Sequence, residues 1–380
     1  MKLGLIISND WELFGDGSGD YFELQHRPLE ALLQTVEDHG ANLTVMAEVG
    51  QQWAHQQLAP HAPWAREIVE AWEAILKDTV ARGSDVQLHL HPQWLQARYT
   101  QDAWHVDYDQ WAIGDLDPVT IETHLRDGKA YLERLLQPIH PDYECIAFRA
   151  GAYCIEPSQH VIASLNKLGF LCDSSVTKGL YHPQYYDYRD AHAQLIPWFV
   201  IPAGVKYRND CDEGLLEIPI YAHESIDSPL LRKFVSPSFF YRICFGVKLS
   251  QQDQQWLSLK NKRMVQRYPV LQRNVVKNNI TSLKWLLSKI FLKNAIQLDY
   301  DSLPPKAFVK CLQNIFEHQS IPAKHEDVIL PVMASGHVKE VPNFDNMHRI
   351  LDEINTNMKD RVVFWNLRDA IRYWLNLQPA

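Results

Sequence analysis

Short apolar runs alternate with longer segments of helical periodicity along most of this 380-residue chain. Such alternation is typical of a parallel sheet whose strands are connected by helices. We predict strands over residues 2–9, 42–49, within 85–94, and over 144–151, 170–176, 215–220, 328–337 and 362–366. Helices are expected at 23–38, 64–82, 118–136 and 157–168, with a closing helix that ends near residue 375. Seven or eight such units predict a distorted (β/α)7–8 barrel.

The stretch 85–94 carries the most specific polar pattern. Apolar residues alternate there with Gln87, His89 and His91, and Pro92 ends the run. Side chains two residues apart leave a strand on the same side, so the two histidines should point the same way at the carboxyl end of a buried strand. Two imidazoles held together in this way can ligate a divalent metal. The alternative is a pair of ordinary polar residues at a strand end.

Charged and imidazole side chains also mark the ends of other predicted strands. Asp10 and Glu12 follow the first strand with the same i, i+2 relation as the histidines. In a barrel, the carboxyl ends of all strands share one face, and sites are built on that face. An inert barrel would not need acidic, basic and imidazole groups at so many of these ends, so the pattern favours an enzyme. The residues in question are Asp10, Glu12, His89, His91, Arg149, Asp173, Glu217 and His337.

Composition narrows the class of protein. No apolar run approaches the ~18 residues that a membrane-spanning helix needs, and the N-terminus has no small-residue cleavage site. The six cysteines form no CxxC pair, which indicates reduced thiols and a cytoplasmic protein.

Charge is segregated along the chain. Residues 223–324 hold 16 Lys+Arg and 6 Asp+Glu, although the whole chain has a net charge of -9. Within this segment, 280–294 has apolar residues on one helical side and lysines off it. It could lie on an anionic membrane at the inner face, bind a phosphorylated, lipid-linked glycan, or be an ordinary amphipathic helix packed on the barrel. Nucleic acid is excluded as a partner because the rest of the chain is acidic and has no recognition motif.

Taken in order, the motifs resemble those of the polysaccharide deacetylases of the NodB-homology (carbohydrate esterase) group. The similarity is to a divergent branch associated with surface-polysaccharide biosynthesis. The matching segments are SNDWE at 8–12, LHLHP at 88–92, FRAGAY at 148–153, GFLCDSSV at 169–176, LLEIPI at 215–220 and PVMASGH at 331–337. The resemblance covers 1–222 and 325–380, which would form the deacetylase-like barrel, and leaves 223–324 as a basic, mainly helical insertion.

The resemblance implies a metal site made by Glu12, His89 and His91. Zinc suits a mixed set of imidazole and carboxylate ligands, with manganese, cobalt and iron as alternatives. Two departures from the family pattern concern these ligands. The family has adjacent aspartates in its first motif, where this chain has Asp10-Trp11-Glu12, and it has three residues between its histidines, where this chain has one.

The resemblance also implies catalytic roles. Asp10 would be the general base, Arg149 its orienting partner, and His337 the general acid that protonates the leaving amine. Arg149 could instead form a structural ion pair, and His337 could be a solvated loop histidine. Asp173 would orient a site histidine or cap its strand. Tyr153 would donate to the developing oxyanion or simply pack.

The expected function is therefore metal-dependent removal of acetyl groups, N- or O-linked, from a sugar of a surface polysaccharide or its lipid-linked precursor. Three alternatives stay open. The chain could be a metal-dependent amidohydrolase of another family, although the histidine pair would then belong on the first strand. It could be an inactive homologue that binds glycan or membrane. It could also be an assembly protein that acts through its basic segment.

Overall fold

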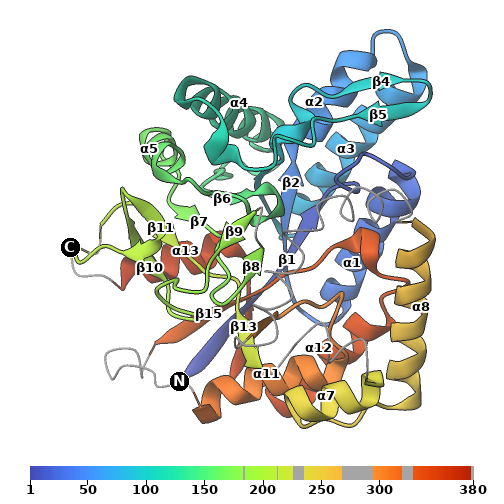
Figure 1. Cartoon of the computed structure of the whole chain (residues 1–380), viewed down its shortest axis with the longest axis vertical. Coiled ribbons are helices and arrows are strands. Elements are labelled where there is room, and N and C mark those ends of the chain that lie inside the picture. The colour runs from blue at the N-terminus through green and yellow to red at the C-terminus, as the bar shows by residue number, and fades with distance from the viewer. Residues whose placement is uncertain (183–184, 212, 226–234, 268–293, 319–327, 378–380) are drawn as a thin grey trace, which may run out of the picture.

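A computed structural model describes residues 1–182, 185–211, 213–225, 235–267, 294–318 and 328–377 (Figure 1). The amphipathic segment predicted at 280–294 lies outside these residues except for Asn294. No helix in the described part of the chain combines the length and the apolar character needed to cross a membrane.

The centre of the molecule is a mixed sheet in which parallel pairs dominate. Its parallel strands are β1 (Lys2–Trp11), β2 (Leu43–Glu48), β3 (Asp85–Leu90), β6 (Ala147–Ala150), β7 (Cys172–Asp173), β12 (Leu216–Glu217), β15 (Ile329–Ala334) and β16 (Val362–Trp365). An antiparallel edge that the sequence did not predict is added by β10 (Trp198–Ile201) and β11 (Gly204–Arg208).

The sheet curls back on itself. Its parallel strands are ordered β12-β7-β6-β3-β2-β1-β15, and β16 pairs with β1. Beyond β12, Ile220 forms a parallel bridge with Met333 of β15, and the Tyr221 N–H donates to the Met333 carbonyl at 3.0 Å. The two ends of the parallel sheet therefore meet, as in a distorted barrel. The number of βα units, seven or eight, stays a prediction.

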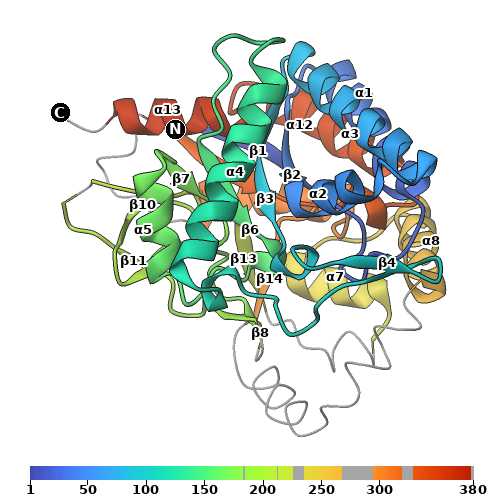
Figure 2. The same cartoon turned by 90° about the horizontal axis from the view of Figure 1, so that it is seen from above.

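Helices cover the outside of this curled sheet (Figures 1 and 2). They are α1 (Arg27–Asp38), α2 (Val49–Leu58), α3 (Pro63–Ala81), α4 (Pro118–Leu136), α5 (Gln159–Lys167), α12 (Asp345–Asn357) and α13 (Leu367–Asn376). Several amphipathic segments were predicted within two residues of these bounds. The helix predicted at 23–38 instead starts with a π turn over Phe22–His26, since Pro28 has no N–H to donate back along the helix.

Two predicted strands are shorter than expected because side chains take the place of the backbone hydrogen bonds between neighbouring strands. The Gln87 side-chain oxygen accepts from the N–H groups of Ile146 and Ala147 at 2.9 and 2.8 Å, so β6 begins only at Ala147. After β7, the Ser174 hydroxyl donates to the Ile218 carbonyl at 2.8 Å, which ends the regular pairing predicted over 170–176.

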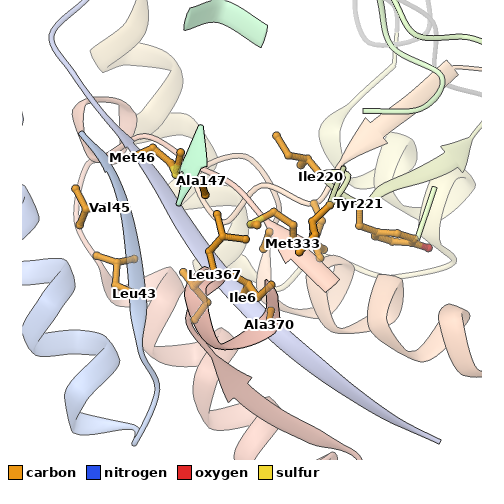
Figure 3. Close-up of a cluster of buried hydrophobic side chains, with 14 of the residues drawn as sticks. Ile6, Leu43, Val45, Met46, Ala147, Ile220, Tyr221, Met333, Leu367 and Ala370 are labelled. Carbon is orange, nitrogen blue, oxygen red and sulfur yellow. The ribbon is translucent and has the colours of Figure 1, made fainter. Parts of the chain in front are cut away.

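The core lies inside the curl and between the sheet and its helices. Ile6, Met46, Ala147 and Met333 come from four different strands and meet in one cluster (Figure 3). Their burial follows from near-continuous apolar strands, as expected for a parallel sheet covered on both faces. The core therefore fixes which side of each strand end is free for polar chemistry.

The described part of 223–324 packs on the same core. It contains β13 (Ala222–Ser225), β14 (Asn294–Gln297), α7 (Pro237–Phe245), α8 (Gln251–Arg267) and α11 (Pro305–His318). Ile296, Phe308 and Leu312 are buried in the cluster that holds the barrel strands. The division into a barrel and an insertion stays a prediction, but this segment also supplies a residue to the site described next.

Candidate active site

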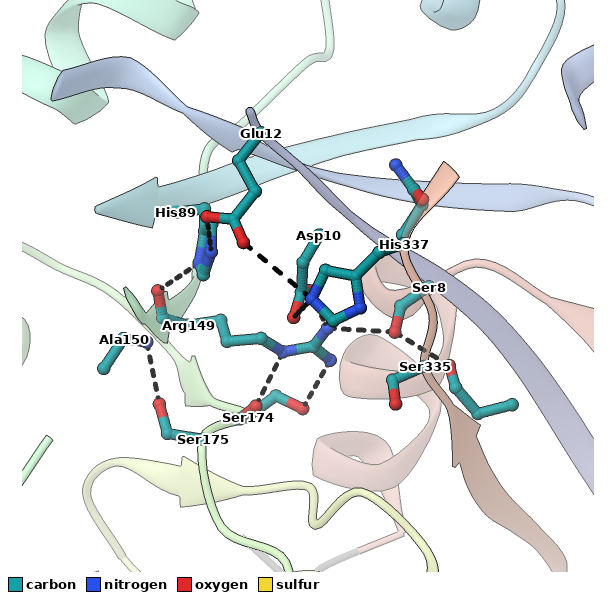
Figure 4. Close-up of polar contacts among 12 residues, drawn as sticks. Ser8, Asp10, Glu12, His89, Arg149, Ala150, Ser174, Ser175, Ser335 and His337 are labelled. Carbon is teal, nitrogen blue, oxygen red and sulfur yellow. Dashed lines mark hydrogen bonds and ion pairs between the residues drawn. The ribbon is translucent and has the colours of Figure 1, made fainter. Parts of the chain in front are cut away.

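The carboxyl ends of β1, β3, β6 and β15 place their polar side chains around one point (Figure 4). His89 is in register with Arg149, and the Asp10 N–H donates to the Gly336 carbonyl at 3.0 Å. Asp10, Glu12, His89, His91, Arg149 and His337 therefore share one site, although 327 residues separate Asp10 from His337.

Three donor atoms face one another at the centre of this site. The Glu12 Oε2 atom lies 3.4 Å from His89 Nε2 and in contact with His91 Nε2. The two Nε2 atoms are 3.2 Å apart, and all three residues are buried. Donor atoms around a tetrahedral zinc, each ~2.0–2.1 Å from the ion, lie about 3.3 Å apart. The spacing of these atoms fits a metal of that kind.

The hydrogen bond of His89 Nδ1 also leaves Nε2, the nitrogen that faces Glu12, as the atom that can bind a metal. His89 Nδ1 lies 2.9 Å from the Arg149 carbonyl oxygen, which can only accept. Nδ1 therefore carries a proton in either charge state, and in the neutral ring the Nε2 lone pair is directed at Glu12. Burial lowers the pKa of His89, but the hydrogen bond that its protonated ring donates to Glu12 and the charge of Asp10 outweigh burial and raise it.

His91 provides a second sign that a ligand belongs here. Its Nδ1 lies 2.9 Å from the Gln93 side-chain nitrogen, while the buried Gln93 side-chain oxygen has no hydrogen-bond partner. Turning the Gln93 amide over would let His91 Nδ1–H donate to that oxygen and would free the Nε2 lone pair. The orphaned oxygen is thus satisfied in the tautomer that a metal requires.

Glu48 at the end of β2 completes a four-residue cluster with Glu12, His89 and His91, whose donor atoms all lie within 4.8 Å of one another. Its two oxygens are already used, because Oε1 accepts from the N–H groups of Gly50 and Gln51, and Oε2 from that of His91 at 2.7 Å. Glu48 therefore caps α2 and positions the His91 backbone.

Asp10 is held by a buried ion pair. Arg149 donates through one nitrogen to Asp10 and to the Ser8 hydroxyl, and its Nε donates to the Ser174 carbonyl at 2.8 Å. Burial raises the pKa of Asp10, but Arg149, His89 and His337 together outweigh it and lower that pKa. Asp10 is therefore ionised and held in one orientation, as the predicted base requires.

His337 is oriented from the opposite side by Asp301. The carboxylate accepts from the His337 N–H at 2.7 Å and lies 3.3 Å from Nδ1, so Nε2 is directed into the site, 3.8 Å from both Asp10 and Glu12. Lys260 in turn holds Asp301 at 2.9 Å. Burial lowers the pKa of His337, but Asp301 and Asp10 raise it to about 9.

Lys339 is the one further cation in contact with the described site. Its ammonium donates to Glu12 Oε1 at 2.6 Å and to the Leu13 carbonyl at 3.0 Å, and the residue is buried. Burial raises the pKa of Glu12, but His91 and Lys339 outweigh it and hold that pKa well below its usual range.

The other predicted residues lie one shell further out. Asp173 accepts from the hydroxyl and N–H of Ser175, which in turn holds the Ala150 N–H at 2.9 Å, so Asp173 positions the arginine motif rather than a histidine of the described site. Burial and the Asp173 carboxylate raise the pKa of Glu217 well above its usual range, and Glu217 Oε1 accepts from the Val176 N–H at 3.1 Å. Burial also keeps the half-buried Tyr153 phenol protonated, and its side chain hydrogen-bonds Ser335.

Four site residues were missed in the sequence. Glu48 ends a predicted strand, so the rule that selected Glu12 and the histidines could have found it. Lys339 lies two residues after His337, and Gln93 two residues after His91, but neither type stands out in a loop. Asp301 lies in the segment without a matching motif, and only the fold brings it to His337.

No family model and no curated protein sequence matches this chain. Among solved structures, it is similar to a protein from Mycobacterium smegmatis assigned as a polysaccharide deacetylase, with 12% identity, 100% of this chain and 92% of that chain covered, and a TM-score of 0.44. A probable polysaccharide deacetylase from Pseudomonas aeruginosa PAO1 gives 12% identity, coverage of 100% and 92%, and a TM-score of 0.42. A GH57-type branching enzyme from Pyrococcus horikoshii is 10% identical. The match covers 98% of this chain and 70% of that chain, with a TM-score of 0.46.

Proposed function

We propose that this chain is a metal-dependent hydrolase that removes N- or O-linked acetyl groups from a sugar of a surface polysaccharide or of its lipid-linked precursor, on a distorted barrel of seven or eight βα units. The observation that carries the proposal is that the three donor residues Glu12, His89 and His91 lie next to an ionised Asp10 and a cationic His337. The His337 Nε2 atom is 3.8 Å from the Asp10 carboxylate. A base and an acid beside a metal site are the groups that amide hydrolysis needs.

Glu12, His89 and His91 would hold the ion, for which zinc is the first choice. When bound, the ion supplies Lewis acidity that polarises the acetyl carbonyl group. Each ligand is held by a further contact, from Lys339 on Glu12, from the Arg149 carbonyl on His89 and from Gln93 on His91. Such outer contacts fix the direction of the ligand atoms.

The protein's own groups move the protons. Asp10 takes a proton from the water whose oxygen attacks the acetyl carbon, and Arg149 keeps the carboxylate directed at that water. His337 then gives its Nε2 proton to the leaving nitrogen or oxygen as the bond to the acetyl carbon breaks. The products are acetic acid and the sugar amine or alcohol, and the side chains regain their protonation states from solvent.

The test begins with elemental analysis of untagged protein against a His89→Ala, His91→Ala double variant. We expect about one metal per chain, lost in the double variant, and acetate release from acetylated glycans that follows metal loading. No metal in the wild type after addition of zinc, manganese or cobalt would contradict this function.

One observation favours a second candidate, an inactive homologue that binds glycan. Glu12 already has the Lys339 ammonium as a counter-ion, and Asp10 already has Arg149. A site whose carboxylates are neutralised by protein cations has less need of a metal. Stable folding without metal, together with no uptake of added metal, would support this candidate.

A further inference from the structure

A cavity of about 470 Å³ has Leu13, the residue that follows Glu12 in the chain, in its wall. It is lined by residues of the loop that follows β1, of α2 and α3, and of the hairpin of β4 (Arg98–Thr100) and β5 (Ala103–His105). Figures 1 and 2 both show this hairpin alongside α2. A cavity of this size accommodates a small organic molecule.

Aromatic rings form much of its wall. The Trp64 and Tyr99 ring centroids are 4.7 Å apart, and those of Tyr99 and Trp104 are 5.3 Å apart. Trp64 at the start of α3 is 37% exposed and Tyr108 is 42% exposed, so part of this aromatic surface is open to a ligand. Large rings left open around a concave site are favourable surfaces for cations and for apolar CH groups.

The charged groups that line the cavity are all acidic. Asp16, Asp20 and Asp102 line it, and among the described lining residues there is no lysine or arginine. Asp102 sits at the tip of the β4–β5 turn with a positive φ of 56°, a conformation that Asp and Asn tolerate. The cavity therefore repels anions such as phosphate and attracts cations.

His55 gives a buried polar group inside the same cavity. It is 1% exposed, lines the cavity, and stacks edge-on to Trp104 with ring centroids 5.0 Å apart. Its Nδ1 donates to the Gln51 carbonyl at 2.9 Å, which leaves Nε2 without a partner among the described residues. Burial lowers the pKa of His55 to about 4, so at neutral pH the ring carries no charge and Nε2 can accept a hydrogen bond.

We propose that this cavity binds an organic ammonium ion, with its carbon body against Trp64, Tyr99 and Trp104 and its positive charge near Asp16 and Asp102. Open aromatic rings, carboxylates and a neutral acceptor are together the groups that select such a cation over a neutral or anionic molecule. Both an alkylammonium compound and an amino sugar have this chemistry. The proposal does not depend on the metal or on hydrolysis.

Two pairs of probes test it on the full-length protein by titration calorimetry. Choline is compared with the uncharged alcohol in which carbon replaces its nitrogen, and glucosamine with N-acetylglucosamine. We expect the charged member of at least one pair to bind about tenfold more tightly than its neutral partner, and less tightly as salt is added. The pair that shows the difference identifies the source of the ammonium group. Equal affinity within both pairs, or no binding of either cation at millimolar concentrations, overturns the proposal.

Two variants locate the binding. Trp64→Ala removes a partly exposed ring at a helix start, and Asp102→Asn removes a charge at a turn that Asn accepts, so both should fold. Each is expected to weaken cation binding about tenfold. Tyr207→Ala on β11, which also removes an exposed ring, is the control. Cation binding that both variants leave unchanged would lie elsewhere and would also overturn the proposal. Metal uptake should be normal in all three variants, which separates this test from that of the active site.

Discussion

Lys339 and Glu12 form a buried ion pair at the centre of the candidate site, with Nζ 2.6 Å from Oε1. The other carboxylate oxygen faces the two histidines. Glu12 therefore presents one oxygen to a protein cation and the other to the position where a metal would lie. An ammonium so placed both orients the carboxylate and competes with the metal for its charge.

Lys339→Met keeps much of the side-chain volume and removes the competing charge. Without metal, we expect the free energy of unfolding to fall by ~3–5 kcal/mol, because Glu12 stays buried without its ammonium. Metal affinity should rise about tenfold, since a like charge has been removed from beside the ligand. Chemical denaturation and competition with a chromophoric chelator measure the two effects.

The control is Lys206→Met, which removes a partly buried lysine whose Nζ is 3.5 Å from Glu156 and 3.4 Å from Asp190, away from the site. It should leave metal affinity unchanged. A lower metal affinity in Lys339→Met would mean that orientation of Glu12 by Lys339 outweighs the competition between the two cations.

Gly151 determines where the His91 ring can lie. A Cβ added at Gly151 would come within 2.4 to 2.7 Å of three atoms of that ring. Gly151→Ala must therefore displace His91, and we expect metal affinity to fall at least tenfold, as for loss of ligand geometry. In Gly204→Ala the new Cβ would meet only the edge of the exposed Tyr207 ring at 3.1 Å, so metal binding should stay normal. Unchanged metal affinity in Gly151→Ala would argue against His91 as a ligand.

Gln93 is expected to affect the metal without touching it. Gln93→Met keeps the size of the side chain but cannot accept from His91 Nδ1–H, so metal affinity should fall about 10–100-fold. Gln56→Met, which removes a side-chain amide that bonds the Tyr131 hydroxyl at 3.0 Å, is the matched control. If both variants bind metal as the wild type does, the orphaned Gln93 oxygen has no connection with a ligand.

The sequence predicted the part of the site that depends on strand periodicity. Asp10, His89 and Arg149 could be placed on one face because each ends an apolar run, and parallel strands end on the same side of a sheet. The i, i+2 rule likewise predicted that His89 and His91 turn toward one metal position. These predictions needed only local pattern and the rule for parallel sheets.

The rest depended on contacts between distant segments. Two contacts bring Asp301 to His337. The Tyr300 hydroxyl donates to the Asn9 side-chain oxygen, and the Ser335 N–H donates to the Leu298 carbonyl. No local sequence pattern encodes either contact. Strand lengths failed for a related reason, because Gln87 replaces backbone pairing for Ile146. Side chains that replace backbone hydrogen bonds between strands follow no periodic sequence pattern, so they cannot be predicted from the sequence in this way.

Asp85 links stability to pH at the opposite end of β3. Burial raises the pKa of its carboxyl group from the usual 3.8 to about 6, despite hydrogen bonds from the Gln87 amide and the Arg368 N–H. The folded chain therefore binds this proton more tightly than the unfolded chain does. As the pH falls through about 6 toward 4, protonation of Asp85 increases the free energy of unfolding.

Asp85→Asn removes that gain. Relative to the wild type, the variant should be more stable at pH 7 than at pH 4 by about 2–3 kcal/mol, measured by urea unfolding across this range. Asp142→Asn, a change of an exposed carboxylate, should leave the wild-type pH profile in place. A profile for Asp85→Asn parallel to that of the wild type would show that Asp85 titrates alike in both states.

His337 should affect the reaction and not the metal. Its Nε2 is 3.8 Å from Glu12 Oε1 and its Nδ1 is held by Asp301, so the ring lies beside the three-donor cluster without belonging to it. His337→Gln should keep about one metal per chain while acetate release falls about 10²–10⁴-fold, the usual effect of losing a general acid. For acetyl esters the loss should be smaller than for amides, because an alkoxide leaves more readily than an amide anion. Equal losses on both substrates would indicate that His337 acts on the substrate before bond cleavage. Loss of the metal in this variant would instead make His337 a ligand.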